Sequence, residues 1–521
     1  MAAAEQPASF GALVRRAAES RPDEPAVIDA DVRWSWAELS RTVARLAAAF
    51  VGCGLRVDDR IAIQAASSAE FVAVYLAALQ AELVVVPINP AYTLPELEHI
   101  LADSGARMLV TGSVAVVEAA AELRERHPQL LGIVVAARSA SEDLQTVTEL
   151  IEGAGSELLE QDGRTGEQLA VLLYTSGTSG RPKGAMLPVR ALLGNLGQLA
   201  QLSPPPLTAA DRIFLPLPLF HIFGLNAGLG MALYFGATLV LSGRFDAEAS
   251  LATIRDERIS VVVGAPLEFA QWAARPEVAE AFAGVRFALS GSAPLSAELV
   301  GSYAGFGVAL FEGYGLTEAA PVVTVNLVPA EAGAGWADPK PGSVGRPLPG
   351  VEVRLTDSDG ELAEVGDLGL LEVRGSNLFT GYWPDSADGP DAEGWFGTGD
   401  LAVADDEGDY YLVGRRGDLV LVNGFNVYPA EVEAVFARLA GVREVAVLGM
   451  PDTGSDAEVI VAYVVPEAGT VLDPAALIAQ AAGSLARFKL PRRVVEADTL
   501  PHTATGKVMK WRLRNAAAGP S

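Results

Sequence analysis

The most informative segment reads Tyr174-Thr175-Ser176-Gly177-Thr178-Ser179-Gly180-Arg181-Pro182-Lys183-Gly184, and it follows the apolar run Ala170–Leu173. Its glycines permit a ligand to approach the backbone closely, and its four small hydroxyl residues and Lys183 can bind phosphate oxygens. A buried strand followed by this loop therefore predicts a phosphate-binding site. It is not the loop of P-loop ATPases, because Pro182 stands where their second glycine is required and no Gly-Lys-Ser/Thr follows.

On the N-terminal side of this loop, helical and strand-like patterns alternate. The spacing of apolar residues predicts a helix over Trp36–Gly54, a strand over Arg60–Gln64, a helix over Ala69–Gln80 and a buried strand over Leu83–Pro87. A further helix over Leu94–Ser104 continues the alternation. This rhythm indicates an α/β fold with mostly parallel sheets covered by helices.

The pattern changes towards the C-terminus. Between about Gly342 and Val413, short alternating strands are separated by Gly and Asp turns, which predicts an antiparallel, barrel-like subdomain. The last hundred residues alternate helices and strands again and predict a small α/β unit.

Composition narrows the classes of partner. The 521 residues include 38 Lys and Arg against 65 Asp and Glu, a formal net charge of -27. Such an acidic surface repels phosphate backbones and anionic lipid, so we expect neither nucleic acid nor a membrane as partner. Residues 213–243 carry no fixed charge, but Pro216, Pro218 and several glycines predict strand, loop, helix and strand rather than a membrane span.

The numbers of cysteines and histidines limit which disulfides and metal sites the protein can form. Cys53 is the only cysteine and there are four histidines, which excludes an intrachain disulfide and disfavours a His/Cys zinc site. The segment Met1–Phe10 lacks a basic start followed by an apolar run, so we expect a cytoplasmic protein without a secretory signal.

A second segment with chemical potential reads Phe311-Glu312-Gly313-Tyr314-Gly315-Leu316-Thr317-Glu318. Tyr314 offers a flat face for a nucleotide base, Thr317 can bind a phosphate oxygen, and Glu318 can bind Mg²⁺, which prefers oxygen ligands. Alternatively, Tyr314 is a core aromatic and Glu318 a solvated side chain. The segment alone leaves both interpretations open.

Two more segments become informative when they are considered together with the two motifs above. Gly397-Thr398-Gly399-Asp400 matches the spacing of a dinucleotide fingerprint, but Asp400 would repel a pyrophosphate and a strand rather than a helix is predicted to follow. Asp400 and Arg415 suit the hydroxyl groups of a ribose instead. Near the C-terminus, Thr505-Gly506-Lys507 can present a single cation to a distant site.

Together, the phosphate loop, Tyr-Gly-Leu-Thr-Glu, Thr-Gly-Asp and Thr-Gly-Lys resemble the adenylate-forming superfamily of acyl-CoA synthetases, luciferases and peptide-synthetase adenylation domains. The resemblance extends from about Phe10 to Arg514. It implies a large N-terminal domain, residues 1–414, built of two doubly wound α/β subdomains and a small β-barrel-like subdomain. A hinge at residues 415–418 would join it to a small mobile α+β C-terminal domain, residues 419–521.

The resemblance also implies roles for individual residues. Thr175–Lys183 would hold the triphosphate of ATP, with Thr317 on phosphate and Glu318 on Mg²⁺, and Asp400 and Arg415 would bind the ribose. The adenine pocket would consist of Gly291, Ser292, Ala293, Glu312, Gly313 and Tyr314, and Gly315 would also belong to the nucleotide-binding residues. Lys507 would bridge the substrate carboxylate and the α-phosphate. The expected catalytic residues are Lys507, Glu318, Thr175 and His221.

For the second half-reaction, relatives rotate the C-terminal domain and bring in a different surface. Here that surface would be Val422–Pro429, with Gly424 and Phe425 at the tunnel for the pantetheine arm of coenzyme A. The chain departs from the family pattern at Gly417, where relatives usually carry Lys or Asp at the hinge. Glycine still permits a large change in backbone angles.

The acid pocket is predicted from Pro218-Leu219-Phe220-His221-Ile222-Phe223-Gly224-Leu225. Amino-acid-activating relatives place an Asp beside that aromatic residue, whereas here His221 has only apolar neighbours, which favours an apolar acid. The expected lining residues are Phe220, His221, Phe223, Gly224, Gly264, Leu316 and Ala319. His221 could also be a purely structural histidine.

The substrate expectation is therefore a carboxylic acid, most simply a medium- or long-chain fatty acid, activated with ATP and Mg²⁺ and passed to coenzyme A. An arylpropenoic acid and a carrier-protein thiol as acceptor remain alternatives, as does a nucleotide-binding module without catalysis. A serine hydrolase is excluded because no Gly-x-Ser-x-Gly occurs. The protein is expected to be a monomer or homodimer.

Overall fold

The structure is a computed structural model of the 521-residue chain. It describes residues 7–30, 32–136, 144–154, 158–159, 161, 163–175, 182–330, 335–357, 359–422, 425–451, 458–503 and 506–518. The chain folds into two compact units. The first comprises Met1–Glu352 and Val373–Phe396, and the second comprises Val353–Glu372 and Gly397–Ser521.

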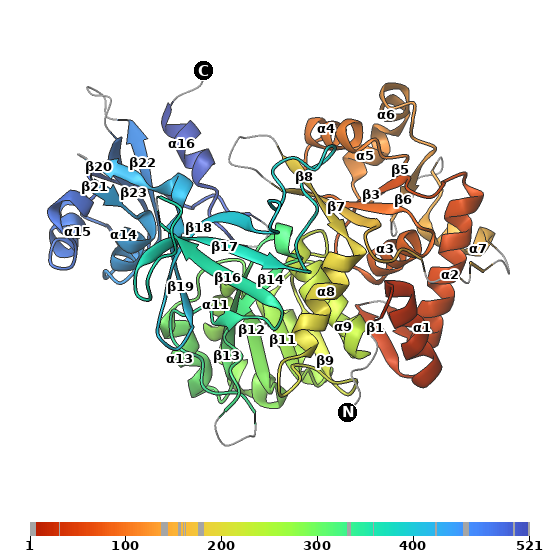
Figure 1. The fold of residues 1–521 in the computed structure, drawn as a ribbon, viewed down its shortest axis with the longest axis horizontal. Helices are drawn as coiled ribbons and strands as arrows, with labels where there is room; N and C mark the ends of the chain where they lie inside the picture. Colours follow the sequence, from red (N-terminus) through yellow and green to blue (C-terminus); the bar gives the residue numbers. More distant parts are fainter. Residues whose placement is uncertain are drawn as a thin grey trace. The chain divides into compact units, whose positions relative to one another are not determined.

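A six-stranded, mostly parallel sheet forms one layer of the first unit (Figure 1). Its strand order is β6 (Gly132–Val135), β5 (Met108–Thr111), β3 (Arg60–Gln64), β4 (Val84–Pro87), β7 (Leu169–Thr175) and β8 (Lys183–Pro188). Only the β7–β8 pair is antiparallel. Helices α4 (Leu94–Ser104), α5 (Val114–Glu118) and α6 (Ala120–Arg126) cover one face, and α3 (Ala69–Gln80) covers the other, backed by α2 (Trp36–Gly52).

A nine-stranded sheet forms the second layer of this unit. Its strand order is β15 (Arg346–Pro347), β14 (Val322–Val325), β13 (Leu310–Gly315), β12 (Phe287–Ser290), β11 (Val261–Gly264), β9 (Arg212–Leu215), β10 (Thr238–Leu241), β1 (Pro25–Asp29) and β2 (Val32–Ser35). The strands from β13 to β1 run parallel, and β2, β14 and β15 are antiparallel additions.

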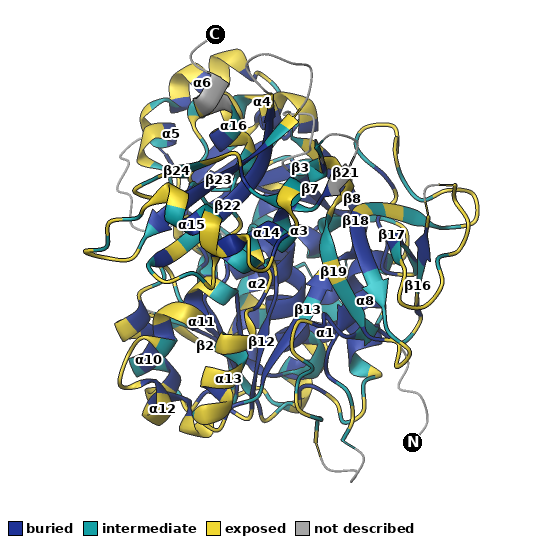
Figure 2. Ribbon diagram, turned by 90° about the vertical axis from the view of Figure 1, so that its left-hand side faces the viewer, coloured by how far each residue is buried: buried dark blue, intermediate teal, exposed yellow. Residues whose placement is uncertain are grey.

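Helices cover both faces of the nine-stranded sheet because side chains alternate along its buried strands. Residues such as Val262 and Ala288 point towards α10 (Ala247–Asp256), α11 (Pro266–Ala273), α12 (Val278–Ala281) and α13 (Ala297–Gly305). Figure 2 shows exposed residues on α10, α12 and α13 and a buried strand β12. Their neighbours Val261 and Leu289 face the opposite layer, made of α8 (Val189–Ala200), η1 (Phe223–Gly230) and α9 (Met231–Phe235).

The second unit contains three sheets. A four-stranded sheet has the order β16 (Val351–Thr356), β17 (Leu368–Gly375), β18 (Phe396–Ala404) and β19 (Tyr410–Arg415), and the division between the units falls within β16, β17 and β18. A β20 (Val420–Val422)–β21 (Phe425–Val427) pair follows, and then β22 (Val442–Pro451), β23 (Glu458–Pro466) and β24 (Arg493–Glu496). The helices here are α14 (Pro429–Phe436), α15 (Pro474–Ala481) and α16 (Lys510–Ala518).

The predicted mixed α/β fold with parallel sheets and a small C-terminal part is confirmed. The uncharged stretch is also confirmed as strand, loop, helix and strand, although its first helical part, η1, is a π-helix. Within the described ranges, none of the helices combines the length and apolar character needed to cross a bilayer. The hinge at residues 415–418 stays a prediction.

Candidate active site

Four of the predicted segments follow the carboxyl ends of neighbouring parallel strands. Phe220 and His221 come after β9, Gly264 ends β11, Gly291 follows β12, and the segment Tyr314–Glu318 begins in the last residues of β13 and continues beyond it. Since these four strands are adjacent in the sheet, their carboxyl ends share one edge. Ligands of α/β proteins bind at this edge.

Contacts at Gly291 show how closely these segments converge. A methyl group placed on Gly291 would lie 3.1 Å from two ring carbons of Phe223 and 3.3 Å from the carbonyl oxygen of Gly313. The next residue, Ser292, has a positive φ of 72°, which is uncommon outside glycine and is frequent at functional sites. Gly291, which is assigned to the predicted adenine pocket, therefore lies against Phe223, which is assigned to the predicted acid pocket.

The two ends of the phosphate loop lie side by side. Thr175 ends β7, Lys183 begins β8, and the two residues are register partners in the antiparallel pair. The Thr175 hydroxyl donates a hydrogen bond to the carbonyl oxygen of Lys183 at 3.5 Å. Ser176, Gly177, Thr178, Ser179 and Gly180 lie outside the described residues.

Glu318 lies on a short 3-10 turn, η3 (Thr317–Ala319), directly after β13. Its carboxylate accepts a hydrogen bond from the hydroxyl of Tyr382 at 2.5 Å, so Glu318 is not simply a solvated side chain. The turn is held from the same segment, because the Asn377 amide donates to the carbonyl oxygen of Ala319 at 2.8 Å. Sequence reasoning missed Tyr382 and Asn377, since their partners lie about 60 residues away in the chain.

The donor set fits Mg²⁺ better than a softer metal. In the described residues, no group of three or more His, Cys, Asp or Glu side chains gathers as a metal cage. Mg²⁺ is commonly held by one or two carboxylates together with substrate phosphates and water. The single carboxylate of Glu318 beside Thr317 is therefore a suitable protein ligand for a metal bound with ATP.

Glu312 and Tyr314 are both buried in β13. One carboxylate oxygen of Glu312 accepts a hydrogen bond from the backbone N–H of Leu295 at 3.1 Å. Burial raises the pKa of Glu312 to about 8, so at neutral pH its carboxyl group is largely protonated and can donate a hydrogen bond. The side chain of Tyr314 is 9% exposed, and its role at the adenine stays a prediction.

In the second unit, Asp400, Arg415 and Lys507 lie close together. Asp400 on β18 pairs with Arg415 on β19, and the Arg415 Nε atom lies 2.8 Å from Asp400 Oδ1. Although the Lys507 side chain is exposed, its pKa is lowered, first by partial withdrawal from water and second by the positive charge of Arg415. Asp400 and Asp418 act in the opposite direction. Residues 107 positions apart in the sequence therefore share one electrostatic environment.

A tight turn presents Lys507. Its backbone N–H donates to the hydroxyl oxygen of Thr503 at 3.0 Å, and its carbonyl oxygen accepts from the N–H of Thr503 at 2.8 Å. Gly506 adopts a positive φ of 81°, a conformation that favours glycine. Of the predicted coenzyme A residues, Gly424 lies outside the described part of the chain and Phe425 belongs to β21. Gly417 lies exposed in the 3-10 turn η4 (Arg416–Asp418).

His221 is neutral at physiological pH. Its Nδ1 atom accepts a hydrogen bond from the backbone N–H of Phe223 at 3.3 Å, which places the remaining proton on Nε2. The residue is partly exposed, yet burial of its ring lowers its pKa to about 4. His221 can therefore offer a neutral N–H donor to the predicted acid pocket.

We expect His221→Gln to weaken the pH dependence of stability. The unfolded chain takes up a proton near pH 6.5 and the folded chain only near pH 4, so His221 lowers the stability of the wild type as the pH falls through this window. The loss is about 2 kcal/mol at pH 5. Unfolding free energies measured at pH 7.5 and pH 5.0 should fall by about that amount more in the wild type than in the variant. An equal loss in both proteins would contradict the low pKa.

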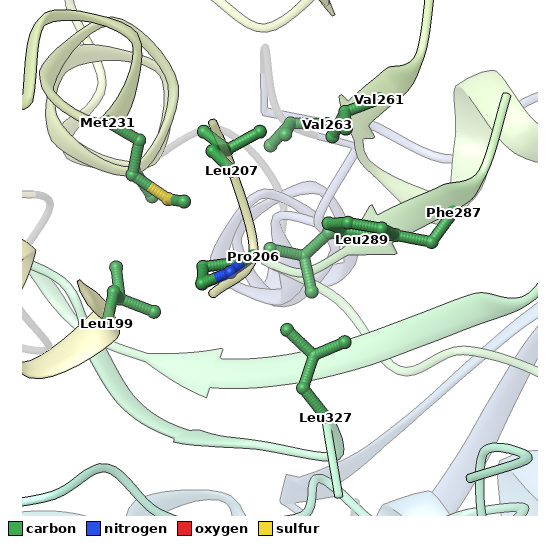
Figure 3. Close-up of a pocket in the computed structure, with 10 residues that line it drawn as sticks. Leu199, Pro206, Leu207, Met231, Val261, Val263, Phe287, Leu289 and Leu327 are labelled. Atoms are coloured by element: carbon green, nitrogen blue, oxygen red, sulfur yellow. The ribbon is translucent and has the colours of Figure 1, made fainter. Parts of the chain in front are cut away.

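An apolar void lies between η1 and the strands next to the acid pocket (Figure 3). It gives the centre of a water molecule only about 10 Å³ of space. Its lining residues are Leu199, Pro206, Leu207, Ala227, Met231, Val261, Val263, Phe287, Leu289 and Leu327. Ala227 of η1 lines this void, and Phe223 begins the same helix.

Comparison with known proteins places the chain in a family. Residues 14–383 match the family model described as AMP-binding enzyme, and residues 431–507 match that of the AMP-binding enzyme C-terminal domain. The chain is 36% identical to feruloyl-CoA synthase of an Amycolatopsis species, over 96% of this chain and 97% of that protein. It is 32% identical to the long-chain-fatty-acid–CoA ligase FadD13 of Mycobacterium tuberculosis, over 97% and 98% of the two chains.

The fold agrees with these matches. The crystal structure of ATP-bound MatB from Rhodopseudomonas palustris superposes with a TM-score of 0.87 at 32% identity, over 98% of this chain and 99% of that chain. Both family models and relatives that align along almost the whole length lead to one assignment. The chain belongs to the AMP-binding enzyme family and is an acid–thiol ligase of the AMP-forming, acyl-CoA synthetase type.

Proposed function

We propose that the protein activates an apolar carboxylic acid with ATP to an acyl-adenylate and pyrophosphate, and then transfers the acyl group to coenzyme A. The observation that carries this proposal is the grouping of Lys507 with the Asp400–Arg415 pair. A carboxylate that attacks the α-phosphate brings two anions together. A cation held beside a ribose-binding pair is suited to stabilise the charge that develops there.

The predicted site residues have separate roles in this reaction. Asp400 accepts from and Arg415 donates to the ribose hydroxyls, and Lys507 contacts the carboxylate and α-phosphate during adenylation. Thr175, Lys183 and Thr317 bind phosphate oxygens. Glu318 would hold Mg²⁺, which when bound offsets phosphate charge as a Lewis acid.

The acid pocket favours a substrate without charge on its tail. Between Pro218 and Leu225 the only polar side chain is His221, which is neutral. An ammonium group buried there would lose its hydration without gaining a carboxylate partner, at a cost of several kcal/mol. Amino acids are therefore disfavoured as substrates.

Among apolar acids, a fatty acid is the first candidate substrate, as expected from the sequence. One observation supports an aryl acid as a second candidate. Phe223 packs over Gly291, and the apolar void lined by Ala227 of the same helix has room for no more than about one water molecule. A flat ring can stack on Phe223. A long acyl chain needs more space than this void offers, so side chains must move to admit it.

A matched pair of acids tests the proposal. The acids 3-phenylpropanoate and phenylalanine differ only in the ammonium group, and we expect phenylalanine to be adenylated at least about a hundredfold less efficiently. The measurement is acyl-adenylate formation with ATP and Mg²⁺, followed by mass spectrometry. Equal use of the two acids would contradict an apolar pocket.

Two further comparisons complete the substrate assignment. Ferulate, octanoate and palmitate separate an aryl preference from a preference for medium or long chains. Parallel reactions with coenzyme A and with a pantetheine-bearing carrier protein identify the acceptor. Thioester formation with the carrier alone would overturn the proposed use of free coenzyme A.

A further inference from the structure

The segment that follows β17 joins two parts of the predicted nucleotide site. Its backbone pairs with β8, since Trp383 N–H donates to the Gly184 carbonyl oxygen at 2.8 Å and Met186 N–H donates to that of Gly381 at 3.0 Å. Its other end is tied to η3, because Phe379 N–H donates to the carbonyl oxygen of Glu318 at 2.8 Å. One short stretch therefore connects the strand that begins with Lys183 to the turn that carries Glu318.

Tyr382 is the residue of this segment that contacts both functional side chains. Its hydroxyl donates to Glu318 Oε1 at 2.5 Å, and its ring centroid lies 5.2 Å from the Lys183 ammonium. A hydrogen bond to a carboxylate is shorter and stronger than one between neutral groups, and an ammonium over an aromatic face is attracted to it. This hydrogen bond is to Oε1, and a carboxylate can coordinate a cation through its other oxygen.

The backbone around Tyr382 restricts where its side chain can point. A methyl group on Gly381 would lie 2.3 Å from the carbonyl oxygen of Ser386, and Gly381 has a positive φ of 134°, so this position favours glycine. Tyr382 N–H donates to the Ala387 carbonyl oxygen at 2.9 Å. Its ring also packs edge-on against Phe379, with centroids 5.1 Å apart.

We infer that Tyr382 is a positioning residue that orients the Glu318 carboxylate for Mg²⁺ and holds the Lys183 ammonium beside it. This inference rests on the proposed role of Glu318 in binding the metal that accompanies ATP. Without the hydroxyl, Glu318 can rotate away from the metal, and partners that orient a metal ligand typically contribute about 10- to 100-fold to affinity or activity. Lys183 also pairs with Asp388 at 2.8 Å, which holds the ammonium near the ring.

Tyr382→Phe tests the inference, because it removes only the hydroxyl and keeps the ring. The probe is Mn²⁺ with a non-hydrolysable ATP analogue, followed by electron paramagnetic resonance. We expect Mn²⁺ binding about 10-fold or more weaker, while the metal-free analogue binds within about twofold of wild type. Unchanged Mn²⁺ affinity, or an equal loss of metal-free binding, would overturn the inference.

Two control variants separate the possible failures. Tyr411→Phe deletes a similar hydroxyl-to-carboxylate hydrogen bond, to Asp405 at 3.1 Å, and should leave Mn²⁺ binding unchanged. Glu318→Gln tests the proposed metal ligand itself. If Glu318→Gln weakens Mn²⁺ binding and Tyr382→Phe does not, only the role of Tyr382 fails. If neither does, the metal role proposed for Glu318 fails as well.

Discussion

Lys507→Ala is expected to lower acyl-adenylate formation by about a hundredfold or more and to leave thiolysis of a supplied acyl-adenylate largely intact. Removing the ammonium takes away a charge that is needed only while carboxylate and α-phosphate are being joined. The measurement is pyrophosphate release for the first half-reaction and thioester formation from synthetic acyl-adenylate for the second. Equal damage to both half-reactions would contradict the assigned role.

Lys510→Ala provides the matched control. Lys510 lies three residues further along and its ammonium pairs with Glu433 at 2.8 Å, so the variant removes the same charge from the same region. Adenylate formation should remain within about threefold of wild type, because this partly buried pair is assigned no contact with the substrates. A large loss in this variant would mean that general electrostatics, rather than Lys507 itself, supports the reaction.

The lowered pKa of Lys507 adds a pH signature. Adenylation needs the protonated ammonium, and its pKa lies below the ordinary value of 10.5. The rate should therefore decline with rising pH earlier than an ordinary lysine would cause. Lys507→Arg, whose charge persists, should move that decline to higher pH whatever activity it retains.

Much of the fold follows from local sequence patterns. The predicted bounds of Arg60–Gln64, Ala69–Gln80 and Leu94–Ser104 are those that the structure has. These elements have strong apolar periodicity, and α3 and α4 begin at polar caps, Ser68 and Thr93. The predicted helix from Trp36 ends at Gly52 rather than Gly54. Differences of one or two residues at a helix end depend on how the last turn is capped.

The features that local sequence patterns did not predict depend on contacts with residues far away in the sequence. The helix after Phe223 is a π-helix whose Asn226 amide donates to the carbonyl oxygens of Leu192 and Ala320, 34 and 94 residues away. Tyr382 reaches Glu318 only because the segment around it pairs with β8 in one register. In the sequence, Gly381-Tyr382-Trp383 predicts a turn that contains two aromatic residues. No local pattern indicates which residue either aromatic side chain contacts.

Motif chemistry, in contrast, selected residues that the structure brings together. The motifs assign Asp400 and Arg415 to the ribose as acceptor and donor, and the structure places them in one ion pair. The sequence supports a functional role for Lys507 only through the accompanying motifs. In the structure, Lys507 shares the electrostatic environment of the Asp400–Arg415 pair. Residue type suggested Asp400 and Arg415 because ribose hydroxyls call for an acceptor and a donor, and the binding roles of these residues stay predictions.

The second large effect is expected at the predicted hinge. Gly417 is exposed in the turn η4, and a side-chain carbon at its position would meet no atom within 4 Å. A β-carbon therefore fits at this position, and the first turn of a helix tolerates proline. In this conformation, Lys507 lies with Asp400 and Arg415, which is the grouping that the proposed adenylation step uses.

Gly417→Pro should consequently adenylate nearly as well as wild type but form thioester about a hundredfold more slowly. Proline fixes φ, and a backbone conformation incompatible with proline costs about 3 kcal/mol, which corresponds to that factor. Gly417→Ala is the control, because alanine keeps the N–H and most of the backbone freedom. Rapid-quench measurement of acyl-adenylate and thioester separates the two steps, and adenylate should accumulate only in the proline variant. If thioester forms at the wild-type rate in Gly417→Pro, the rotation between half-reactions does not depend on residue 417, and the hinge must lie elsewhere in the chain.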